Sequence, residues 1–386
     1  MTLIHIIDWV LWIFMAPSVI YVFFYAIVSL FHRKQKPYST TGIHQSSFLI
    51  LFPAYKEDTV IVHSVRQCLE QTYPKALYHI GVISDHMQDE TNELLRQLPI
   101  TLFTPQFEKS SKAKALHFAM EHTAESYDYL VILDADNMVM PDFLDQVNAS
   151  CQQGYKAIQC HRCAKNSEND VAVLDGVSEE INNTIFRKAH NTIGISSALI
   201  GSGMCFPYNW FKEHVGRLDS AVEDREFEVF LLKENVYIKF EEQIPVFDEK
   251  VSSRENFERQ RQRWLNGQIQ TLMLMLPYIP KAIAKLNINY IDKTIQQALI
   301  PRSILLALLP VLALIVMLVS SVWSHKWWGL FLMLCVSLYI AIPSQMRTRT
   351  VFGKLIYFPR LALQMMKNIL HLDSRNKDFL HTTHGH

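Results

Sequence analysis

The strongest constraint on the fold of this chain comes from three apolar runs near its ends that contain no charged residue. They cover residues 9–31, 303–324 and 327–346, and each has the roughly 20 residues that a helix needs to cross a bilayer. The first run is followed by the basic sequence HRKQK, and no small-residue cleavage site separates the two. It is therefore predicted to be an uncleaved membrane anchor and not a signal peptide.

The second and third runs are separated only by His325 and Lys326, so they are predicted to form a helical hairpin linked at these two residues. Residues 270–286 and 351–370 mix basic residues with apolar stretches broken by proline. Such segments are typical of helices that lie in the membrane interface. A core helix of the soluble part is the alternative for both.

The positive charges that flank these runs indicate an orientation. They are concentrated on one side of the predicted spans, whereas residues 1–8 carry no lysine or arginine. By the positive-inside rule, residues 32–302 and the C-terminus are predicted to lie in the cytoplasm. The flanking bases on that side are Arg33, Lys34, Lys36, Arg302, Arg347 and Arg349.

Overall charge and cysteine content exclude some classes of function. The chain has no net formal charge, so its composition gives no indication of a nucleic-acid partner. Its six cysteines are scattered, and the sequence CHRC at 160–163 is not followed by a second such pair. An isolated CxxC in a cytosolic domain is weak evidence for zinc, so these cysteines are predicted to be reduced structural thiols.

Residues 45–265 alternate between strand-like and helix-like patterns, which predicts an α/β fold with a doubly wound, mostly parallel sheet. The expected strands cover 47–55, 77–85 and 129–136, and the expected helices between them cover 59–72 and 113–124. Neither a GxGxxG nor a P-loop motif is present, so the dinucleotide fingerprint and the P-loop do not apply.

Carboxylates follow these predicted strands at the points where each strand ends. Asp85 ends the second strand, and Asp134 and Asp136 end the third. Because the carboxyl ends of parallel strands meet at one edge, these side chains are expected to lie together and to need a cation. Hard oxygen ligands suit Mg²⁺ or Mn²⁺. Capping of the following helices is the alternative role for each aspartate.

Four motifs follow one another along the chain: SDHMQDET at 84–91, DAD at 134–136, VED at 222–224 and QRQRW at 260–264. In this order they resemble the family 2 glycosyltransferases, in the membrane-integrated branch of cellulose, chitin and hyaluronan synthases. The layout is most similar to that of the nodulation chitooligosaccharide synthase. The resemblance covers roughly residues 45–268 and the pattern of spans around them. It implies a GT-A domain, a Rossmann-like nucleotide-sugar-binding fold, with transmembrane helices at both ends.

The resemblance also implies roles for individual residues. It places the nucleoside of a UDP-sugar at Pro53, Ala54, Tyr55, Glu57 and Asp85, and it places the diphosphate at Lys112, Gln260 and Arg263. Asp134 would contact the sugar and, with Asp136, a divalent metal. Asp224 would be the catalytic base, and Glu223 beside it belongs to the same catalytic motif; a favourable helix N-terminus is the alternative for both. Trp264 would stack on the acceptor sugar.

Three further features are read from the residues. Gln260, Arg263 and Trp264 have the spacing i, i+3 and i+4, so they are expected to share one helix face; the outer arginines of 254–264 could instead meet anionic lipid headgroups. The glycines of GSGM at 201–204 suit either a close approach to the transferred sugar or a plain turn. The sequence FLHTTH at 379–384 resembles the gating loop of cellulose synthases at Phe379 and Thr382 but departs from it at His381 and His384. A disordered tail is the alternative.

The sequence thus predicts a multi-pass plasma-membrane enzyme with a cytoplasmic catalytic domain. The preferred activity is an inverting hexosyl- or N-acetylhexosaminyltransferase that extends a polysaccharide or oligosaccharide from a UDP-sugar. Single transfer to a lipid acceptor, an inactive membrane scaffold and a transporter are the alternatives, and export subunits stay open. The predicted parts are an anchor at 1–36, the catalytic domain at 45–268, interfacial helices at 269–300, the hairpin at 303–346 and an interfacial helix with the tail at 351–386.

Overall fold

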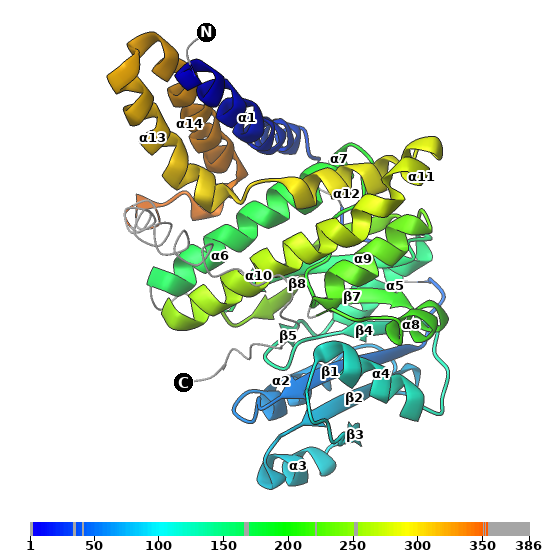
Figure 1. Cartoon of the computed structure of the whole chain (residues 1–386). Coiled ribbons are helices and arrows are strands. Elements are labelled where there is room, and N and C mark those ends of the chain that lie inside the picture. Colours follow the sequence, from blue (N-terminus) through cyan, green and yellow to red (C-terminus); the bar gives the residue numbers. More distant parts are fainter. Residues whose placement is uncertain are drawn as a thin grey trace.

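The computed structural model describes residues 3–33, 36–40, 42–165, 170–220, 222–250, 254–349, 351 and 353. Two parts are visible in Figure 1: an α/β body, and a bundle of three helices that projects from one end of it. The bundle joins the two ends of the described chain, because it contains α1 (Leu3–Ser29), α13 (Arg302–Val319) and α14 (Ser321–Ala341). The predicted interfacial helix at 351–370, apart from residues 351 and 353, and the tail sequence at 379–384 lie outside the described residues.

One mixed sheet forms the centre of the body, with the strand order β3-β2-β1-β4-β7-β6-β8-β5. The strands that the sequence predicted are present at nearly the expected positions, although β4 ends at Ile132. The strand bounds are β1 Phe48–Tyr55, β2 Tyr78–Asp85, β3 Thr101–Phe103, β4 Tyr129–Ile132, β5 Met138–Val139, β6 Ala157–Ala164, β7 Met204–Pro207 and β8 Ile238–Asp248.

The prediction of a mostly parallel sheet is confirmed, with two reversed strands that it did not include. In one half, β3, β2, β1 and β4 pair in parallel, with Tyr55 beside Asp85 at the carboxyl edge. Strand β7 pairs antiparallel with both β4 and β6, and β5 pairs antiparallel with β8, whereas β6 and β8 pair in parallel. Strands β6 and β8 therefore run in the same direction as β4, and β7 alone runs away from the edge where Gly201 and Gly203 lie in this part of the sheet.

Helices cover both faces of the sheet, each over its own apolar core. On one face Ile61 and Val65 of α2 and Phe143 of α5 pack on β1 and β2 side chains. The other face is covered by α4, α8 and α9. The bounds are α2 Ile61–Cys68, α3 Asp89–Arg96, α4 Lys112–His122, α5 Phe143–Gln152, α6 Asp170–Asn182, η2 Asn183–Ala189, α7 His190–Thr192, α8 Tyr208–Val215 and α9 Glu223–Lys233.

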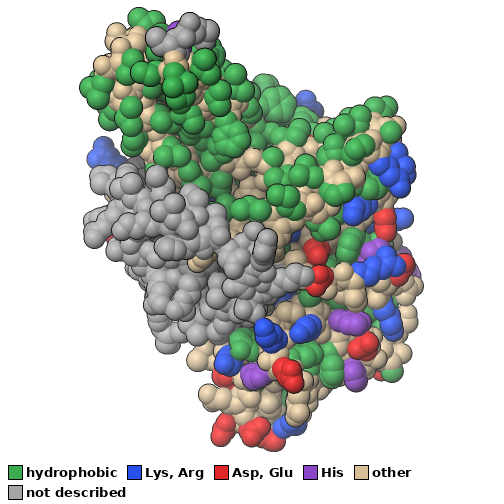
Figure 2. Space-filling view, in the orientation of Figure 1, with side chains coloured by type: hydrophobic (Ala, Val, Ile, Leu, Met, Phe, Trp, Pro, Cys, Tyr) green, Lys and Arg blue, Asp and Glu red, His purple; other side chains and the backbone are tan. Residues whose placement is uncertain are grey.

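A second layer of helices lies between the sheet and the bundle (Figure 1). It consists of α10 (Arg254–Met275), α11 (Ile279–Ala284) and α12 (Ile288–Ala298), and the short turn η3 (Leu276–Tyr278) joins α10 to α11. Two further short turns, η1 (Lys75–Leu77) and η4 (Ser344–Met346), lie outside this layer. Several apolar side chains of this layer are exposed, and Figure 2 shows that they continue the hydrophobic surface of the bundle. Examples are Ile283, Leu286 and Ile288.

Among the described residues, two helices are long and apolar enough to cross a membrane, namely α1 and α13. The predicted hairpin is present as α13 and α14, but its link is not at His325 and Lys326. The turn is at Ser320, whose side chain accepts a hydrogen bond from the N–H of Trp323 and so begins α14. The boundary predicted from hydropathy was therefore about one helical turn too late.

The misplaced link has a physical cause. Lys326 lies inside α14, where its ammonium is 2.5 Å from Asp8 of α1, and Trp327 donates to the same carboxylate at 2.8 Å. Asp8 is likewise inside its helix, although the sequence placed it before the span. Each charge is neutralised by the other, which allows both to stand in apolar helices.

Hydrogen bonds tie α1 to the layer below it. Tyr25 donates to Asp292 of α12 at 2.7 Å, Tyr21 donates to the same carboxylate at 3.0 Å, and His190 lies 3.0 Å from it. The ring of Tyr25 stacks on that of His190 with centroids 3.8 Å apart. The predicted anchor is thus bonded to α12 through Asp292, and Ser18 of α1 also accepts from the N–H of Ile300 at 3.0 Å. The predicted domain limits stay a prediction.

Candidate active site

The carboxyl edge of the parallel half brings the predicted residues together. β1 ends at Tyr55 directly beside Asp85 at the end of β2, and Asp134 follows β4 by two residues. The N–H of Asp134 donates to Asn137 Oδ1 at 3.0 Å and to Ser202 Oγ at 3.1 Å. These bonds hold the backbone of the DAD motif in a turn, so that its first carboxylate projects beyond the sheet edge.

Lys112 is the cation at the centre of the site. It begins α4, and its ammonium lies 2.5 Å from Asp134, 3.3 Å from Glu223 and 2.7 Å from the carbonyl oxygen of Gly201. Burial alone would lower the pKa of Lys112, but Asp134 and Glu223 outweigh burial and raise it well above its usual value. Lys112 therefore stays charged and draws together three segments that are distant in the sequence.

Asp136 is the more deeply placed carboxylate of the motif, with 3% of its surface exposed. It accepts hydrogen bonds from the backbone N–H of Glu249 at 2.7 Å and from Asn137 at 3.2 Å. The Asp134 and Asp136 oxygens are hard ligands, and a divalent ion that binds a diphosphate typically takes one or two carboxylates from the protein. The donor set therefore fits Mg²⁺ or Mn²⁺ bound together with a nucleotide diphosphate.

Gly201 lies where the acidic motif and the cation meet. Its φ of +83° is in the left-handed region, and an added Cβ would stand 3.7 Å from Asp224 Oδ2 and 3.8 Å from Lys112 Nζ. The close-approach interpretation of the GSGM sequence thus agrees with the geometry. The backbone of Gly201 forms part of the wall between the two charged groups.

The acidic motif begins α9, as its pattern predicted. Glu223 is buried, and Asp224 is half-buried with its Oδ1 accepting from the N–H of Arg225 at 2.9 Å. Burial raises the pKa of Glu223, and the neighbouring Asp224 raises it further against the opposing effect of Lys112. Deeper in α9, Glu228 pairs with Lys293 of α12 at 2.5 Å, which fixes the helix against the layer above it.

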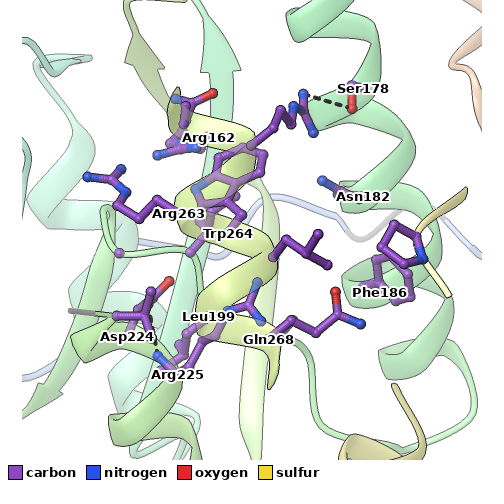
Figure 3. A pocket seen from close by; sticks show the side chains of 18 of the residues that line it. Arg162, Ser178, Asn182, Phe186, Leu199, Asp224, Arg225, Arg263, Trp264 and Gln268 are labelled. Atoms are coloured by element: carbon purple, nitrogen blue, oxygen red, sulfur yellow. Dashed lines mark hydrogen bonds between the residues drawn. The ribbon is translucent and has the colours of Figure 1, made fainter. Parts of the chain in front are cut away.

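Helix α10 places the QRQRW motif beside α9. Gly267 makes this approach possible, because a Cβ there would stand 2.6 Å from the side chain of Val222. The guanidinium of Arg261 lies 4.6 Å from the centroid of the Trp264 ring, so one face of the indole is already covered. Figure 3 shows Trp264 between Asp224 on one side of the cavity and Asn182 on the other, with Arg263 on the side of Asp224.

The nucleoside end is formed by the β1 and β2 termini. Asp85 is buried, and its Oδ1 lies 2.6 Å from His86 Nδ1. The ring of His86 meets that of Tyr55 edge to face at 5.6 Å between centroids. Lys56 and His86 both have positive φ, so the two strand ends turn sharply outward. Glu57 is buried at the same edge.

Sequence reasoning missed Arg162 on β6. Its guanidinium is 3.1 Å from Glu179, 3.8 Å from Asp248 and 4.0 Å from Asp134, so it connects the DAD motif to α6 and β8. The only signal in the sequence was its position within CHRC at 160–163, a pattern that was interpreted through its two cysteines. Cys160 there is a buried thiol whose pKa is raised by burial, as expected for a structural cysteine.

Beside the thiols, His161, Cys163 and Glu180 have potential ligand atoms within 4.8 Å of one another. His161 already contacts Glu180 at 2.9 Å and the carbonyl oxygen of Glu242 at 3.0 Å. Both ring nitrogens are thus engaged by protein oxygens.

All the predicted site residues line one cavity with a volume of about 750 Å³. The cavity also extends to residues that were not predicted, among them Arg162, Arg261 and Arg302. The predicted residues that it brings together are Pro53, Ala54, Tyr55, Glu57, Asp85, Lys112, Asp134, Asp136, Glu223, Asp224, Gln260, Arg263 and Trp264.

Comparison with solved structures shows the same fold in a mannosyltransferase, PcManGT from Pyrobaculum calidifontis, in complex with GDP-Man and Mn²⁺. The TM-score is 0.54 at 15% sequence identity, over 90% of this chain and 94% of that one. The chain also matches S. aureus TarS 1-349 in complex with UDP-GlcNAc, with 11% identity, a TM-score of 0.44, and coverage of 83% of this chain and 91% of that one. At these identities the mannosyltransferase supports the fold alone.

No curated protein matches the chain by sequence. The model of glycosyl transferase family group 2 matches residues 129–342, which is more than half of the chain and includes the DAD, VED and QRQRW motifs. The match and the fold agree with the geometry of the cavity, in which carboxylates and cations surround a space large enough for a nucleotide sugar. The chain belongs to the family 2 glycosyltransferases.

Proposed function

We propose that this glycosyltransferase moves a sugar from a UDP-sugar to an acceptor hydroxyl with inversion, and that Asp224 is the catalytic base. The observation that carries the proposal is the juxtaposition of Asp224 with Gly201 and Lys112 in the cavity that also contains Asp134. A base, a cation and the carboxylates of the DAD motif are thus within reach of one substrate. Inversion rests on the resemblance to the family.

The chemistry follows from the positions of these groups. The acceptor hydroxyl bonds to the anomeric carbon as its bond to the diphosphate breaks, the nucleoside diphosphate leaves with the electron pair, and Asp224 takes the hydroxyl proton. Lys112 and Arg263 stabilise the charge on the leaving diphosphate. A divalent metal held by Asp134 and Asp136 would neutralise part of that charge. Trp264 offers an apolar ring face to the acceptor.

Membrane attachment is part of the proposal. The bundle of α1, α13 and α14 would cross the bilayer, because most of its outward side chains are apolar (Figure 2). The apolar side chains of α11 and α12 would then lie in the interface. The distribution of basic residues supports an orientation with the α/β body on the cytoplasmic side of the plasma membrane.

The donor and acceptor are proposed at different levels of detail. In this proposal Asp85 and Tyr55, which lie side by side at the strand ends, contact a uracil base; the mannosyltransferase of the same fold is in complex with GDP-Man. The transferred group would be a hexose or an N-acetylhexosamine. A growing saccharide is the acceptor that the resemblance implies, and a lipid is the acceptor that the apolar end of the cavity favours.

The test uses purified protein in detergent with Mn²⁺ or Mg²⁺, a panel of UDP-sugars, and GDP-Man as an alternative donor. We expect Asp224→Asn to lower turnover about 10²–10⁴-fold, which is the usual contribution of a positioned base. The exposed Asp142→Asn is the matched control and should leave turnover unchanged. Chelation should also lower turnover, with recovery on adding metal. Equal turnover in Asp224→Asn and the wild type would refute the role of Asp224.

A further inference from the structure

The cavity has two ends of different chemistry. One end contains the carboxylates and cations of the donor site, and the other lies along one flank of the helix bundle. There the walls are mostly hydrocarbon and come from α1, α13 and α14. The lining residues at this end include Val22, Leu306, Ala307, Phe331, Leu338 and Ile342. A single continuous space therefore leads from Asp224 to an apolar flank of the bundle.

A cation stands at the boundary between the two ends. Arg302 begins α13, and its Nη2 donates to the carbonyl oxygen and to Oγ of Ser178 at 2.8 and 2.9 Å. Its Nη1 is buried and has no hydrogen-bond partner among the described residues. Nor does any described carboxylate lie within ion-pair distance of Arg302, whereas the nearby Arg261 pairs with Asp175 at 2.7 Å. A buried guanidinium nitrogen of this kind is a site for an anion.

Polar neighbours complete this boundary. Figure 3 shows Ser178, Asn182 and Phe186 along one wall of the cavity, with Trp264 between them and Asp224. Ser178 also accepts from Arg261, so α6, α10 and α13 meet at one hydroxyl. The boundary therefore offers hydrogen bonds to a headgroup directly below a hydrocarbon wall.

We propose that the acceptor is a lipid with a phosphate-bearing, hydroxylated headgroup. Its phosphate binds Arg302, its hydrocarbon chain lies against α13 and α14, and its hydroxyl reaches Asp224. The inference rests on the proposed function and specifies the acceptor class of the same site. Within the transfer step the headgroup hydroxyl supplies the oxygen and the proton, so no other reactant is needed.

A saccharide chain fits the far end of the cavity less well. Each sugar unit carries several hydroxyls, and each one buried without a partner costs roughly 1–3 kcal/mol. Beyond Arg302, the described lining of α13 and α14 offers hydrogen-bonding side chains at Ser303, Cys335 and Tyr339, whereas Leu306, Phe331 and Leu338 supply none. A hydrocarbon chain has no such requirement and gains from leaving water. The order of anion site and apolar wall thus matches a lipid and not a polymer.

The experiment combines transfer with photo-crosslinking. Purified protein is incubated with a labelled UDP-sugar or GDP-Man and with one acceptor: phosphatidylglycerol, phosphatidylcholine, diacylglycerol or a soluble oligosaccharide. Transfer is measured as label in the organic phase, and turnover of the donor is measured as release of UDP or GDP. A phosphatidylglycerol with a diazirine on its acyl chain is crosslinked in parallel and mapped by mass spectrometry. We expect label in phosphatidylglycerol, which has both the phosphate and the hydroxyl, and crosslinks near Leu306 and Leu338.

Variants separate the lipid site from the donor site. Arg302→Gln should raise the KM for phosphatidylglycerol about ten- to a hundredfold, the effect of losing a hydrogen bond to a charged group, with the donor KM unchanged. Leu338→Trp and Ala307→Phe should fill the apolar end and abolish its crosslinks. The matched controls are Leu318→Trp, at an 87% exposed position on α13, and the exposed Arg96→Gln; both should behave as wild type.

Each outcome decides the inference. Asp224-dependent label in a soluble saccharide that Leu338→Trp leaves unchanged would overturn the lipid acceptor and keep the proposed function. Crosslinks spread equally over the outer faces of α1 and α13, insensitive to Arg302→Gln, would also overturn it. If no donor is turned over, the proposed function fails, and the crosslink pattern by itself decides whether a lipid occupies the cavity.

Discussion

Two buried ion pairs, Lys112 with Asp134 and Lys326 with Asp8, have the same chemistry in opposite surroundings. The first opens onto the cavity, where Asp134 keeps 30% of its side chain exposed, and it shares its lysine with Glu223 and Gly201. The second is enclosed by aromatic rings, since the Lys326 ammonium lies 4.0 Å from the Trp9 ring centroid and Trp327 donates to Asp8.

The difference shows what each pair can do. A pair with an open side can exchange one partner for a substrate, whereas an enclosed pair can only hold its helices together. We therefore expect substitutions at the open pair to act on turnover and substitutions at the enclosed pair to act on stability. Four predictions test this division, and they are given from the largest to the smallest expected change in free energy of unfolding or of activation.

The largest effect is expected at Glu179, which supports the open site from behind. Burial alone would raise the pKa of Glu179, but Arg162, Lys250 and Arg187 outweigh it and lower that pKa to about 2. Glu179→Gln leaves these cations without their shared carboxylate and should lower the free energy of unfolding by about 3–5 kcal/mol. Chemical denaturation at neutral pH measures it.

Acid provides the signature of this carboxylate. Because the folded pKa is depressed, the stability that ionised Glu179 contributes is fully present above the unfolded value of 4.5 and is lost as pH falls toward 2. The difference in free energy of unfolding between the wild type and Glu179→Gln should therefore shrink as the pH falls from 4.5 toward 2. The exposed Glu93→Gln, which loses a surface pair with Arg96, should cost about 0–1 kcal/mol and is the control. A pH-independent gap would contradict the assignment.

Next in size is the open pair itself. Lys112→Gln removes the cation that faces Asp134 and Glu223 and should lower turnover about 10²–10³-fold, as for loss of one preorganised donor. Initial rates with saturating donor measure it. The neighbouring exposed Lys114→Gln should keep full turnover. A Lys112→Gln protein that loses its fold while each folded molecule stays fully active would reverse the division between the two pairs.

The enclosed pair should give the converse result. Lys326→Met leaves the buried Asp8 without its cation and should destabilise the protein by about 2–3 kcal/mol, below the range for deeply buried pairs because Lys326 is 20% exposed. Thermal unfolding in detergent measures the loss. Asp8→Asn combined with Lys326→Met should recover most of it, since no charge is then left alone. A double variant as unstable as the single one would argue against a pairwise effect.

The smallest effect separates backbone strain from site geometry. Gly201→Ala and Gly154→Ala both place a side chain at positive φ and should each cost about 1–2 kcal/mol in stability. Only the first adds a Cβ beside Asp224 and Lys112, whereas the second meets nothing within 4 Å. Turnover should therefore fall in Gly201→Ala alone. An equal loss of turnover in both would assign the effect to strain.

Much of the site could be predicted because its residues belong to short local patterns. The strands before Asp85 and Asp134 are continuous apolar runs, and the spacing of Gln260, Arg263 and Trp264 follows from the helix period. These patterns need no knowledge of the tertiary fold. The residue roles themselves stay predictions until the variants are measured.

Other features depend on partners that are far away in the sequence. The reversed direction of β7 comes from its pairing with β4, about seventy residues earlier, which no local period encodes. Arg162 pairs with Glu179 of α6 and Asp248 of β8, and it lies outside the four motifs that carry the family resemblance. The turn at Ser320 could not be placed because Lys326 resembles a loop residue until Asp8, 318 positions away, is known to neutralise it.

The hydrogen bonds of Asp292 have a consequence for how the protein would sit in a bilayer. Asp292 accepts hydrogen bonds from Tyr21 and Tyr25 of α1, and the next residue, Lys293, pairs with Glu228 of α9, the helix that begins in the VED motif. The first helix therefore cannot change its tilt independently of the α/β body. A mismatch between its apolar length and the membrane would have to be met by the lipids or by rotation of the whole molecule. In a bilayer, the height of the candidate active site above the lipid headgroups would thus be a fixed dimension of the protein, to which the surrounding lipids would adapt.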